Sequence, residues 1–197
     1  MNNKKLTEED YIAAATALGV DEATIRAIIE VETGGKSGFL PSGKPRILFE
    51  RHLMWRRLRA YGFNPPDYAE GNIDILGPDW DRQYYVGGEG EWERMERASR
   101  IHLPSAIEAT SWGLFQILGM HWKALGYESA QDFSRKMEES EMKQLEAFIR
   151  YVRVNNLIDE LRNKDWRGFS KKYNGPGFSE NHYDTKLAAA YKKWGGK

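Results

Sequence analysis

The sequence predicts a mainly helical protein of the α+β class, with at least seven helices and a small β element near residues 39–50. Apolar residues recur at helical spacing in most segments, and only the run Arg46–Glu50 is short and apolar enough to indicate a strand. Apolar residues make up 41% of the chain and aromatic residues 13%, which is enough for a real core. Because the 197 residues contain no repeat and no Pro- or Ser-rich linker, we expect one domain over residues 1–197.

The start of the chain carries two consecutive helix signals. Thr7 is a good N-cap before an acidic first turn, and Gly19 is a stop signal, so a helix is expected over residues 7–18. Because Glu8, Glu9 and Asp10 separate the first lysines from the apolar residues, the segment is not expected to be a signal peptide. A second helix is expected from the N-cap Asp21 to the stop at Thr33-Gly34-Gly35.

The remaining helices are expected from their apolar periodicity, and residues 61–90 are expected to be loops with at most a short helix. The basic helix that follows Glu50 is interpreted as a solvated face, and the segment Ser111–Ile117 as core packing around a satisfied Gln116. These helices are expected over residues 51–60, 92–101, 104–109, 140–162, 165–173 and 183–194.

Two glutamates near the end of the second helix differ in their expected environment. Ile25, Ile28 and Ile29 define the apolar stripe, and Glu32 extends it at position i+7, whereas Glu30 points to the far side. Burial and the negative end of the helix dipole both favour a protonated carboxyl group at position 32. Glu32 is therefore a candidate acid, and a partly buried Glu paired with a basic neighbour is an equally open alternative.

The segment after Glu32 contains GGKSG, which is similar to the end of a phosphate-binding loop. That loop needs a glycine where Glu30 stands, so the match is incomplete. The balance of 29 basic and 29 acidic residues argues against a nucleic-acid partner, and no stretch is long enough to insert into a membrane. There is no cysteine, and the four histidines lack metal-ligand spacing, so neither a metal nor another cofactor is expected.

Three segments occur in an informative order: Glu32-Thr33, Gly113-Leu114-Phe115-Gln116-Ile117 and Tyr173-Asn174-Gly175. Together they resemble motifs of lytic transglycosylases and goose-type lysozymes. The sequence is more closely similar to the N-acetylmuramidase domain family of phage endolysins, through "AIIEVETGGKSGFLPSGKPRILFERH", "SWGLFQILG" and "KKYNGPGFSENHYDTKLAAAY". These segments span residues 27–191, and the resemblance implies a lysozyme-like fold around a sugar-binding groove.

The resemblance also implies roles for individual residues. Glu32 would be the catalytic acid, and the substrate-binding residues would be Ser111, Gln116, Tyr173 and Asn174, with the Tyr173 ring offering a flat surface to a pyranose. The chain departs from the wider motifs in three places, which are Thr33 for Ser, Phe115 for Met and Lys172 for Ala.

Glycoside hydrolysis normally needs a second carboxylate. Glu50 is the leading candidate because it ends an apolar run eighteen residues after Glu32. An ion pair of Glu50 with Arg46 or Arg51 is equally open. Glu108 is the reserve, although a helix-surface position is the favoured interpretation for it.

Three functions remain open from the sequence. The leading one is a peptidoglycan hydrolase that cleaves the β-1,4 bond between N-acetylmuramic acid and N-acetylglucosamine, acting as a phage endolysin. The alternatives are a lytic transglycosylase, which forms 1,6-anhydro products, and a non-catalytic wall-binding module. The leading function implies a monomer that binds glycan strands, is made in the host cytoplasm without a signal peptide, and reaches the wall after the membrane is permeabilised.

Overall fold

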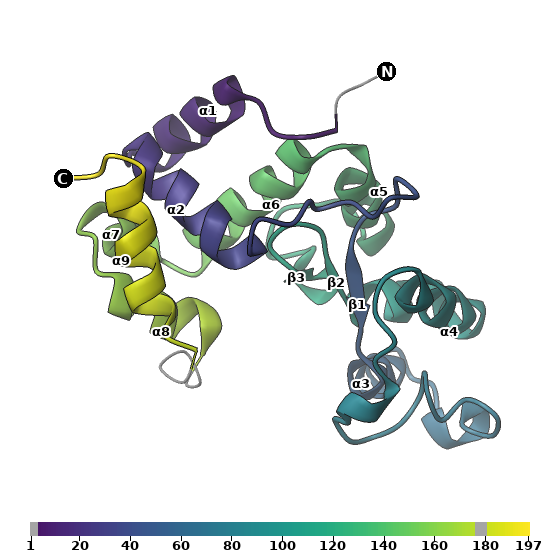
Figure 1. Cartoon of the computed structure of the whole chain (residues 1–197). Coiled ribbons are helices and arrows are strands. Elements are labelled where there is room, and N and C mark those ends of the chain that lie inside the picture. The colour runs from purple at the N-terminus through teal and green to yellow at the C-terminus, as the bar shows by residue number, and fades with distance from the viewer. Residues whose placement is uncertain (1–3, 176–180) are drawn as a thin grey trace. The chain divides into compact units, whose positions relative to one another are not determined.

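The computed structural model describes residues 4–175 and 181–197. Within these ranges the chain forms nine α-helices, three short 3-10 helices and three strands, which confirms the predicted mainly helical α+β class (Figure 1). The helices are α1 Glu8–Leu18, α2 Glu22–Thr33, α3 Arg51–Ala60, α4 Glu89–Glu108, α5 Ala130–Glu139, α6 Glu141–Val154, α7 Ile158–Arg162, α8 Trp166–Asn174 and α9 Tyr183–Lys193. The strands are β1 Ile47–Phe49, β2 Thr110–Trp112 and β3 Ile117–Leu118, and the 3-10 helices are η1 Pro65–Tyr68, η2 Arg82–Tyr84 and η3 Gly119–His121.

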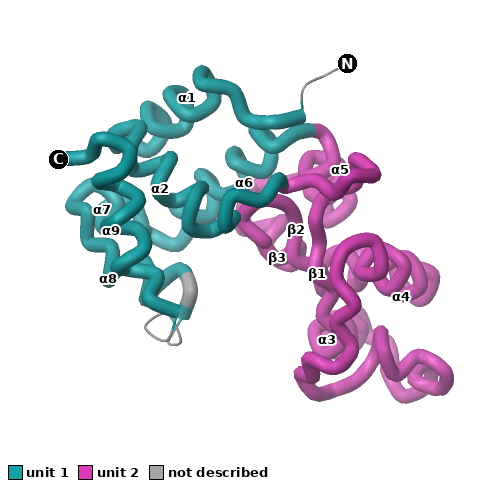
Figure 2. The backbone as a smooth tube through the Cα atoms, in the orientation of Figure 1, with its two compact units in different colours: residues 1–37, 140–197 teal, residues 38–139 magenta. Residues whose placement is uncertain are grey.

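The chain divides into two compact units (Figure 2). The first unit combines both ends of the chain, Met1–Ser37 and Ser140–Lys197, and the second unit is the continuous segment Gly38–Glu139. The expectation of a single domain over residues 1–197 stays a prediction.

In the first unit, α2 and α9 pack through small side chains. Ala23, Ala27 and Ala190 are buried at this contact, and the ring of Tyr191 covers it. Alanines allow two helices to approach closely because no bulky side chain separates their backbones. The contact brings the last turn of α2 and the C-terminal helix into one packed layer.

The caps that the sequence predicted for α2 are present. The side chain of Asp21 accepts the backbone N–H of Thr24 at 2.8 Å, and Gly34 ends the helix with φ 56°. The left-handed conformation at Gly34 is one that glycine adopts without steric cost. The last turn of α2, which carries Glu32, is therefore fixed by local sequence.

The long helix predicted over residues 140–162 is two helices, α6 and α7. Ser140 caps the start of α6 as expected, but Asn155 ends it and Asn156 has φ 53°. A left-handed residue cannot continue a right-handed helix, and Asn tolerates this conformation better than most residues. The Asn-Asn pair therefore breaks what the apolar periodicity indicated as continuous.

The second unit contains an antiparallel sheet of order β1-β2-β3. Ile47 pairs with Trp112, and Trp112 pairs with Ile117 across the β2–β3 hairpin. β1 confirms the strand predicted within Arg46–Glu50. The sheet therefore brings the residue that follows β1, Glu50, and the β2–β3 turn into the same compact unit.

Helix α4 is kinked where the sequence predicted two helices. His102 has φ −160° and ψ 107°, and Pro104 follows inside the assigned helix. Proline lacks the N–H that would continue the helical ladder and its ring excludes the preceding turn. Helix α5, by contrast, was not predicted, although Ala130, Phe133 and Met137 are buried on one face.

The prediction of a solvated basic face on α3 is wrong for two of its four arginines. Arg51 is buried and donates to the backbone carbonyl of Ile73 at 2.8 Å, and Arg57 donates to Glu108 at 2.6 Å. Arg56 and Arg59 are exposed. Among the described residues, no helix is both long enough and apolar enough to cross a membrane.

Candidate active site

Glu32 lies in the last turn of α2, and its side chain is partly buried. The apolar stripe that predicted its direction is buried as expected, at Ile25, Ile28 and Ile29. Beyond the helix the N–H of Gly35 donates to the Thr33 hydroxyl at 3.0 Å. The GGKSG segment is thus a loop that leaves α2.

The negative charge of Glu32 acts on two tyrosines of the first unit. Burial, followed by the negative charge of Glu32, raises the pKa of Tyr173 well above its ordinary value. The same two causes, in the same order, raise the pKa of Tyr183. Both phenols therefore keep their protons at neutral pH, and each is a potential hydrogen-bond donor close to the carboxyl group of Glu32.

The ring of Tyr173 is held by other aromatic side chains. It stacks on Phe169, with ring centroids 5.3 Å apart and an interplanar angle of 10°, and it meets Phe148 and Tyr151 edge-on, at 5.6 Å each. Since Phe169 covers one face, the ring is a fixed part of an aromatic cluster. Its hydroxyl, near Glu32, is the part of the side chain with clear chemical use.

Glu30 has a different environment from Glu32, as the helical spacing predicted. It accepts hydrogen bonds from Lys193 Nζ at 2.9 Å and from Trp194 Nε1 at 2.8 Å. The bond from Lys193 is the largest cause that lowers the pKa of Glu30; burial opposes it and the Trp194 bond adds to it. Glu30 is therefore an ionised surface carboxylate that bridges α2 and α9.

Glu50 stands between β1 and α3, with its side chain 15% exposed. The Tyr85 hydroxyl donates to its Oε2, and His52 Nδ1 lies 3.4 Å from the same oxygen. The proposed arginine partner Arg51 instead donates to a backbone carbonyl and lies over the Tyr84 ring, 4.3 Å from its centroid. The partners that the structure gives Glu50 are thus a phenol and an imidazole.

The reserve carboxylate, Glu108, is built into the core of the second unit. It is 1% exposed, so the helix-surface interpretation is wrong. Its oxygens accept from Arg57 Nε at 2.6 Å, from Trp122 Nε1 at 2.7 Å and from the Tyr61 hydroxyl at 2.9 Å. A carboxylate with three donors and no exposure joins α3 to α4, which is a structural role.

Gln116 lies in the β2–β3 turn and is exposed, so it is not the buried, satisfied glutamine that the apolar run suggested. Its backbone has φ 48°, and its Nε2 donates to the carbonyl oxygens of Gly113 at 2.8 Å and Arg46 at 3.3 Å. A non-glycine residue in the left-handed region costs on the order of 1 kcal/mol, and such strain is enriched at functional sites. The other polar residue of this segment, Ser111, is buried in β2 opposite Leu118.

The predicted site residues are divided between the two compact units. Glu32 and Tyr173 belong to the first unit, where the charge of Glu32 acts on the phenol, and Glu50, Ser111 and Gln116 belong to the second. Asn174 is the last residue of α8, and its side chain lies outside the described part of the molecule. Among the described residues, no group of three or more His, Cys, Asp or Glu could hold a metal ion.

Three residues near the two carboxylates were missed by sequence reasoning. Tyr183 was placed only as the start of the last helix, and His52 only as an ordinary histidine. Tyr85 lies in the loop-rich segment 61–90, where no periodicity separates it from its neighbours. The contact of Tyr85 with Glu50 spans 35 residues of sequence, so no local pattern could have revealed it.

These features define a class of protein. A mainly helical α+β fold with a small antiparallel sheet, a carboxyl group on the last turn of a helix near two protonated phenols, and a second carboxylate directly after a strand indicate a lysozyme-like glycoside hydrolase. The family model of the N-acetylmuramidases matches residues 21–195. The chain belongs to the N-acetylmuramidase family, whose members are glycoside hydrolases that degrade peptidoglycan.

The fold is also similar to a solved structure. The crystal structure of the Burkholderia AP3 phage endolysin matches with a TM-score of 0.92 and 42% sequence identity, over 99% of this chain and 73% of that chain. A comparison with curated proteins found no match.

Proposed function

We propose that this muramidase is a phage endolysin that hydrolyses the β-1,4 bond between N-acetylmuramic acid and N-acetylglucosamine, with Glu32 as general acid and Glu50 as the second carboxylate. The observation that carries the proposal is the environment of Glu32: a partly buried carboxyl group at a helix C-terminus, whose charge acts on the hydroxyls of Tyr173 and Tyr183. The endolysin role is supported by the 42% identity to the AP3 phage endolysin.

Glu32 has the surroundings that a general acid needs. Partial burial and the negative end of the α2 dipole both disfavour the ionised carboxylate, and we propose that Glu32 gives its proton to the leaving glycosidic oxygen. Glu30, two residues earlier, is already ionised and bonded to Lys193. The same helix thus presents one carboxyl group suited to donate a proton and one that serves a surface ion pair.

Glu50 has the surroundings of a carboxylate that works in its ionised form. A phenol and an imidazole lie at hydrogen-bonding reach of its Oε2, and hydrogen bonds donated to an ionised carboxylate stabilise that form. We propose that Glu50 either activates the attacking water or stabilises the positively charged sugar of the transition state.

Four residues are proposed to bind the glycan. The exposed Gln116 uses its Nε2 on backbone carbonyls, which leaves its carbonyl oxygen to accept from a sugar hydroxyl or N-acetyl N–H group. Ser111, Tyr173 and Asn174 are proposed as further contacts on the strength of the family resemblance. We propose that the protein acts as a monomer on glycan strands of the host wall, once the membrane that separates it from the wall is permeabilised.

The test is the chemistry of the products. Purified peptidoglycan is digested and the muropeptides are analysed by mass spectrometry. Hydrolysis adds a water and leaves reducing N-acetylmuramic acid, whereas a lytic transglycosylase leaves 1,6-anhydro ends lighter by about 18 Da, the mass of one water. Reducing ends that Glu50→Gln strongly diminishes are expected; predominantly anhydro ends would contradict hydrolysis and remove Glu50 from the reaction.

A wall-binding module without activity is separated by the same digestion. Such a protein would sediment with peptidoglycan and release no muropeptides. Release by the natural protein, and its loss in Glu32→Gln with binding retained, is the expected result.

A further inference from the structure

Glu50 is held by side chains of its own compact unit, and the most direct contact comes from Tyr85. The Tyr85 hydroxyl donates a hydrogen bond to Glu50 Oε2. A phenol has one proton to donate. In this contact the proton of Tyr85 is directed to the carboxylate.

The backbone on both sides of this contact is fixed by one buried carboxylate. Glu91, at 0% exposure, accepts the N–H of Phe49 through Oε2 at 3.0 Å, and the N–H groups of Val86 and Gly87 through Oε1 at 2.8 and 3.0 Å. Phe49 directly precedes Glu50, and Val86 directly follows Tyr85. One side chain therefore sets the separation of the two segments that carry the pair.

Arg94 neutralises Glu91 and strengthens the same link. Its Nη1 donates to Glu91 Oε2 at 2.8 Å and to the carbonyl oxygen of Phe49 at 3.1 Å, while its Nη2 donates to the Asp74 carbonyl at 2.6 Å. Both polar groups of Phe49 are thus bound by the Glu91–Arg94 pair. The pair thus supplies the partners that these buried backbone groups need, while the next residue, Glu50, donates its own N–H to the carbonyl oxygen of Ala109.

We propose that Tyr85 is a positioning residue of the hydrolase: it orients and stabilises the ionised carboxylate of Glu50, and the Glu91–Arg94 pair holds the two segments in register for this contact. The proposal rests on the proposed role of Glu50 and adds the residue that prepares it. All four side chains belong to the second unit, so the geometry is internal to one compact body.

The electrostatic surroundings agree with this role. Burial is the largest cause that raises the pKa of Tyr85, and the hydrogen bond to Glu50 is the second, so the phenol stays protonated as a donor across the working range of pH. Burial lowers the pKa of His52, while the charge of Glu50 opposes this effect. The charges of Arg51 and Arg56 on α3 also act on His52, and the charge of Arg94 on α4 acts on Tyr85.

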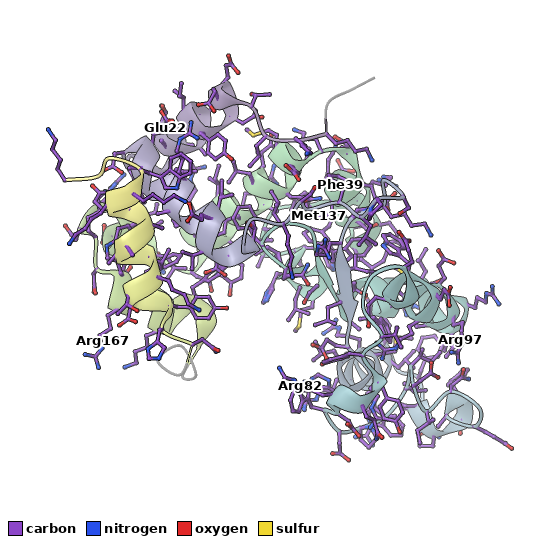
Figure 3. The ribbon with its side chains drawn as sticks, viewed as in Figure 1. Glu22, Phe39, Arg82, Arg97, Met137 and Arg167 are labelled. Carbon is purple, nitrogen blue, oxygen red and sulfur yellow. The ribbon has the colours of Figure 1, made fainter. Side chains whose placement is uncertain are left out.

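The segment that precedes Tyr85 carries exposed side chains. The Trp80 ring is 57% exposed, and the guanidinium of Arg82 lies 5.7 Å from its ring centroid. Arg82, labelled in Figure 3, begins η2, the short helix that ends immediately before Tyr85. Tyr85 therefore follows directly on an exposed segment, and its hydroxyl reaches Glu50.

The test compares Tyr85→Phe with Tyr84→Phe, a matched control that removes the neighbouring hydroxyl and keeps the ring that lies against Arg51. Full-length variants are assayed on solubilised peptidoglycan across pH 4 to 9, after circular dichroism and the unfolding midpoint show that each is folded. We expect Tyr85→Phe to lower kcat/KM about ten- to a hundredfold, the size of a lost hydrogen bond to a charged group. The loss is expected in kcat, with KM unchanged, because the contact prepares a carboxylate of the reaction and does not bind substrate. Tyr84→Phe should leave both unchanged.

Glu50→Gln and the double variant with Tyr85→Phe separate this inference from the proposed function. If Glu50→Gln inactivates the enzyme and Tyr85→Phe behaves as the natural protein, the positioning role is wrong and the role of Glu50 stands. If Glu50→Gln keeps normal activity, the role of Glu50 is wrong, and the inference falls with it. The inference is supported if the double variant is as active as Glu50→Gln alone. Should Tyr85→Phe not fold, Tyr85→His is compared with Tyr85→Leu, since both shorten the side chain and only His can donate a hydrogen bond. A higher kcat in Tyr85→His than in Tyr85→Leu supports the inference, and an equal kcat overturns it.

Discussion

Glu91 accepts the backbone N–H of Phe49 at 3.0 Å, so a carboxylate of α4 is hydrogen-bonded to the last residue of β1. Because Glu91 is fully buried, its charge is tolerated only through Arg94 and the three N–H groups that it accepts. Burying an unpaired charge is far more costly than burying a paired one. This arrangement makes Glu91 a determinant of stability as well as of the geometry before Glu50.

Glu91→Gln is expected to destabilise the protein by about 3–5 kcal/mol, because it leaves the Arg94 guanidinium buried without its counter-charge. The free energy of unfolding is measured by urea denaturation followed by circular dichroism. Glu93→Gln, an exposed glutamate on the same helix, is the control and should change stability by no more than about 0.5 kcal/mol. A Glu91→Gln protein as stable as the control would show that the pair contributes no net stabilisation.

Gln116 is predicted to bind the substrate, while its left-handed backbone conformation lowers the stability of the protein. Gln116→Ala should lower kcat/KM by the equivalent of about 1–3 kcal/mol, because a sugar partner loses its acceptor. Gln116→Gly should lose as much activity and yet be more stable than Gln116→Ala by about 1 kcal/mol, because glycine adopts φ 48° without strain. Activity and urea unfolding are measured on both variants. Natural activity in Gln116→Ala would remove this residue from the substrate site.

Asp21 gives a prediction for the pH dependence of stability. Burial raises its pKa, but hydrogen bonds from Thr24, Lys164 and Tyr191 together outweigh this and lower it to about 2. A carboxyl group with a lowered pKa stabilises the folded state above its unfolded pKa, and the contribution is lost as the pH falls through the folded value. The stabilisation from Asp21 is therefore present above about pH 4 and vanishes toward pH 2.

Asp21→Asn isolates this charge, because Asn is also a good N-cap. The side chain of Asp21 is 46% exposed, and solvent screens its charge. We therefore expect Asp21→Asn to lower the free energy of unfolding at pH 7 by only about 1 kcal/mol. The free energy of unfolding of both proteins is measured in urea at pH 7, 5, 4, 3 and 2. The difference between the two values should become smaller only below about pH 4. A difference in the free energy of unfolding that stays constant down to pH 2 would mean that the charge of Asp21 does not contribute to stability.

Local signals in the sequence were sufficient to predict the elements that carry the candidate site. The cap at Asp21, the isoleucine stripe and the stop at Gly34 placed Glu32 at the last turn of α2, and the short apolar run placed Glu50 directly after β1. These signals act between residues a few positions apart, which is the range that sequence periodicity describes.

The predictions failed mainly where contacts between residues far apart in the sequence determine the environment of a side chain. Glu108 was interpreted as a surface residue because its helix position is uninformative, and only the fold brings Arg57 and Trp122 to its carboxylate. Likewise, the phenol of Tyr85 reaches Glu50 through a loop that has no periodic pattern. The break at Asn156 was missed for another reason: the apolar spacing continues across it, and one left-handed residue ends the helix.

Glu32→Gln is the decisive test of the catalytic assignment. The amide has nearly the same shape as the carboxyl group and cannot deliver a proton to the leaving oxygen, so the fold should persist while wall lysis falls about a hundred- to ten-thousandfold. Lysis is followed by the turbidity of permeabilised Gram-negative cells, and folding by circular dichroism.

Glu30→Gln is the matched control for that test, since it makes the same chemical change two residues away on the same helix, where the carboxylate bonds to Lys193 and Trp194. Its loss of a surface ion pair should cost at most about 1 kcal/mol of stability and leave lysis intact. A comparison with Gln116→Ala orders the roles, because losing a proton donor should cost more than losing one sugar contact. A folded Glu32→Gln protein that lyses cells as well as Glu30→Gln would refute the assignment of Glu32 as the acid, and equal losses in Glu32→Gln and Gln116→Ala would show that proton donation does not dominate the reaction.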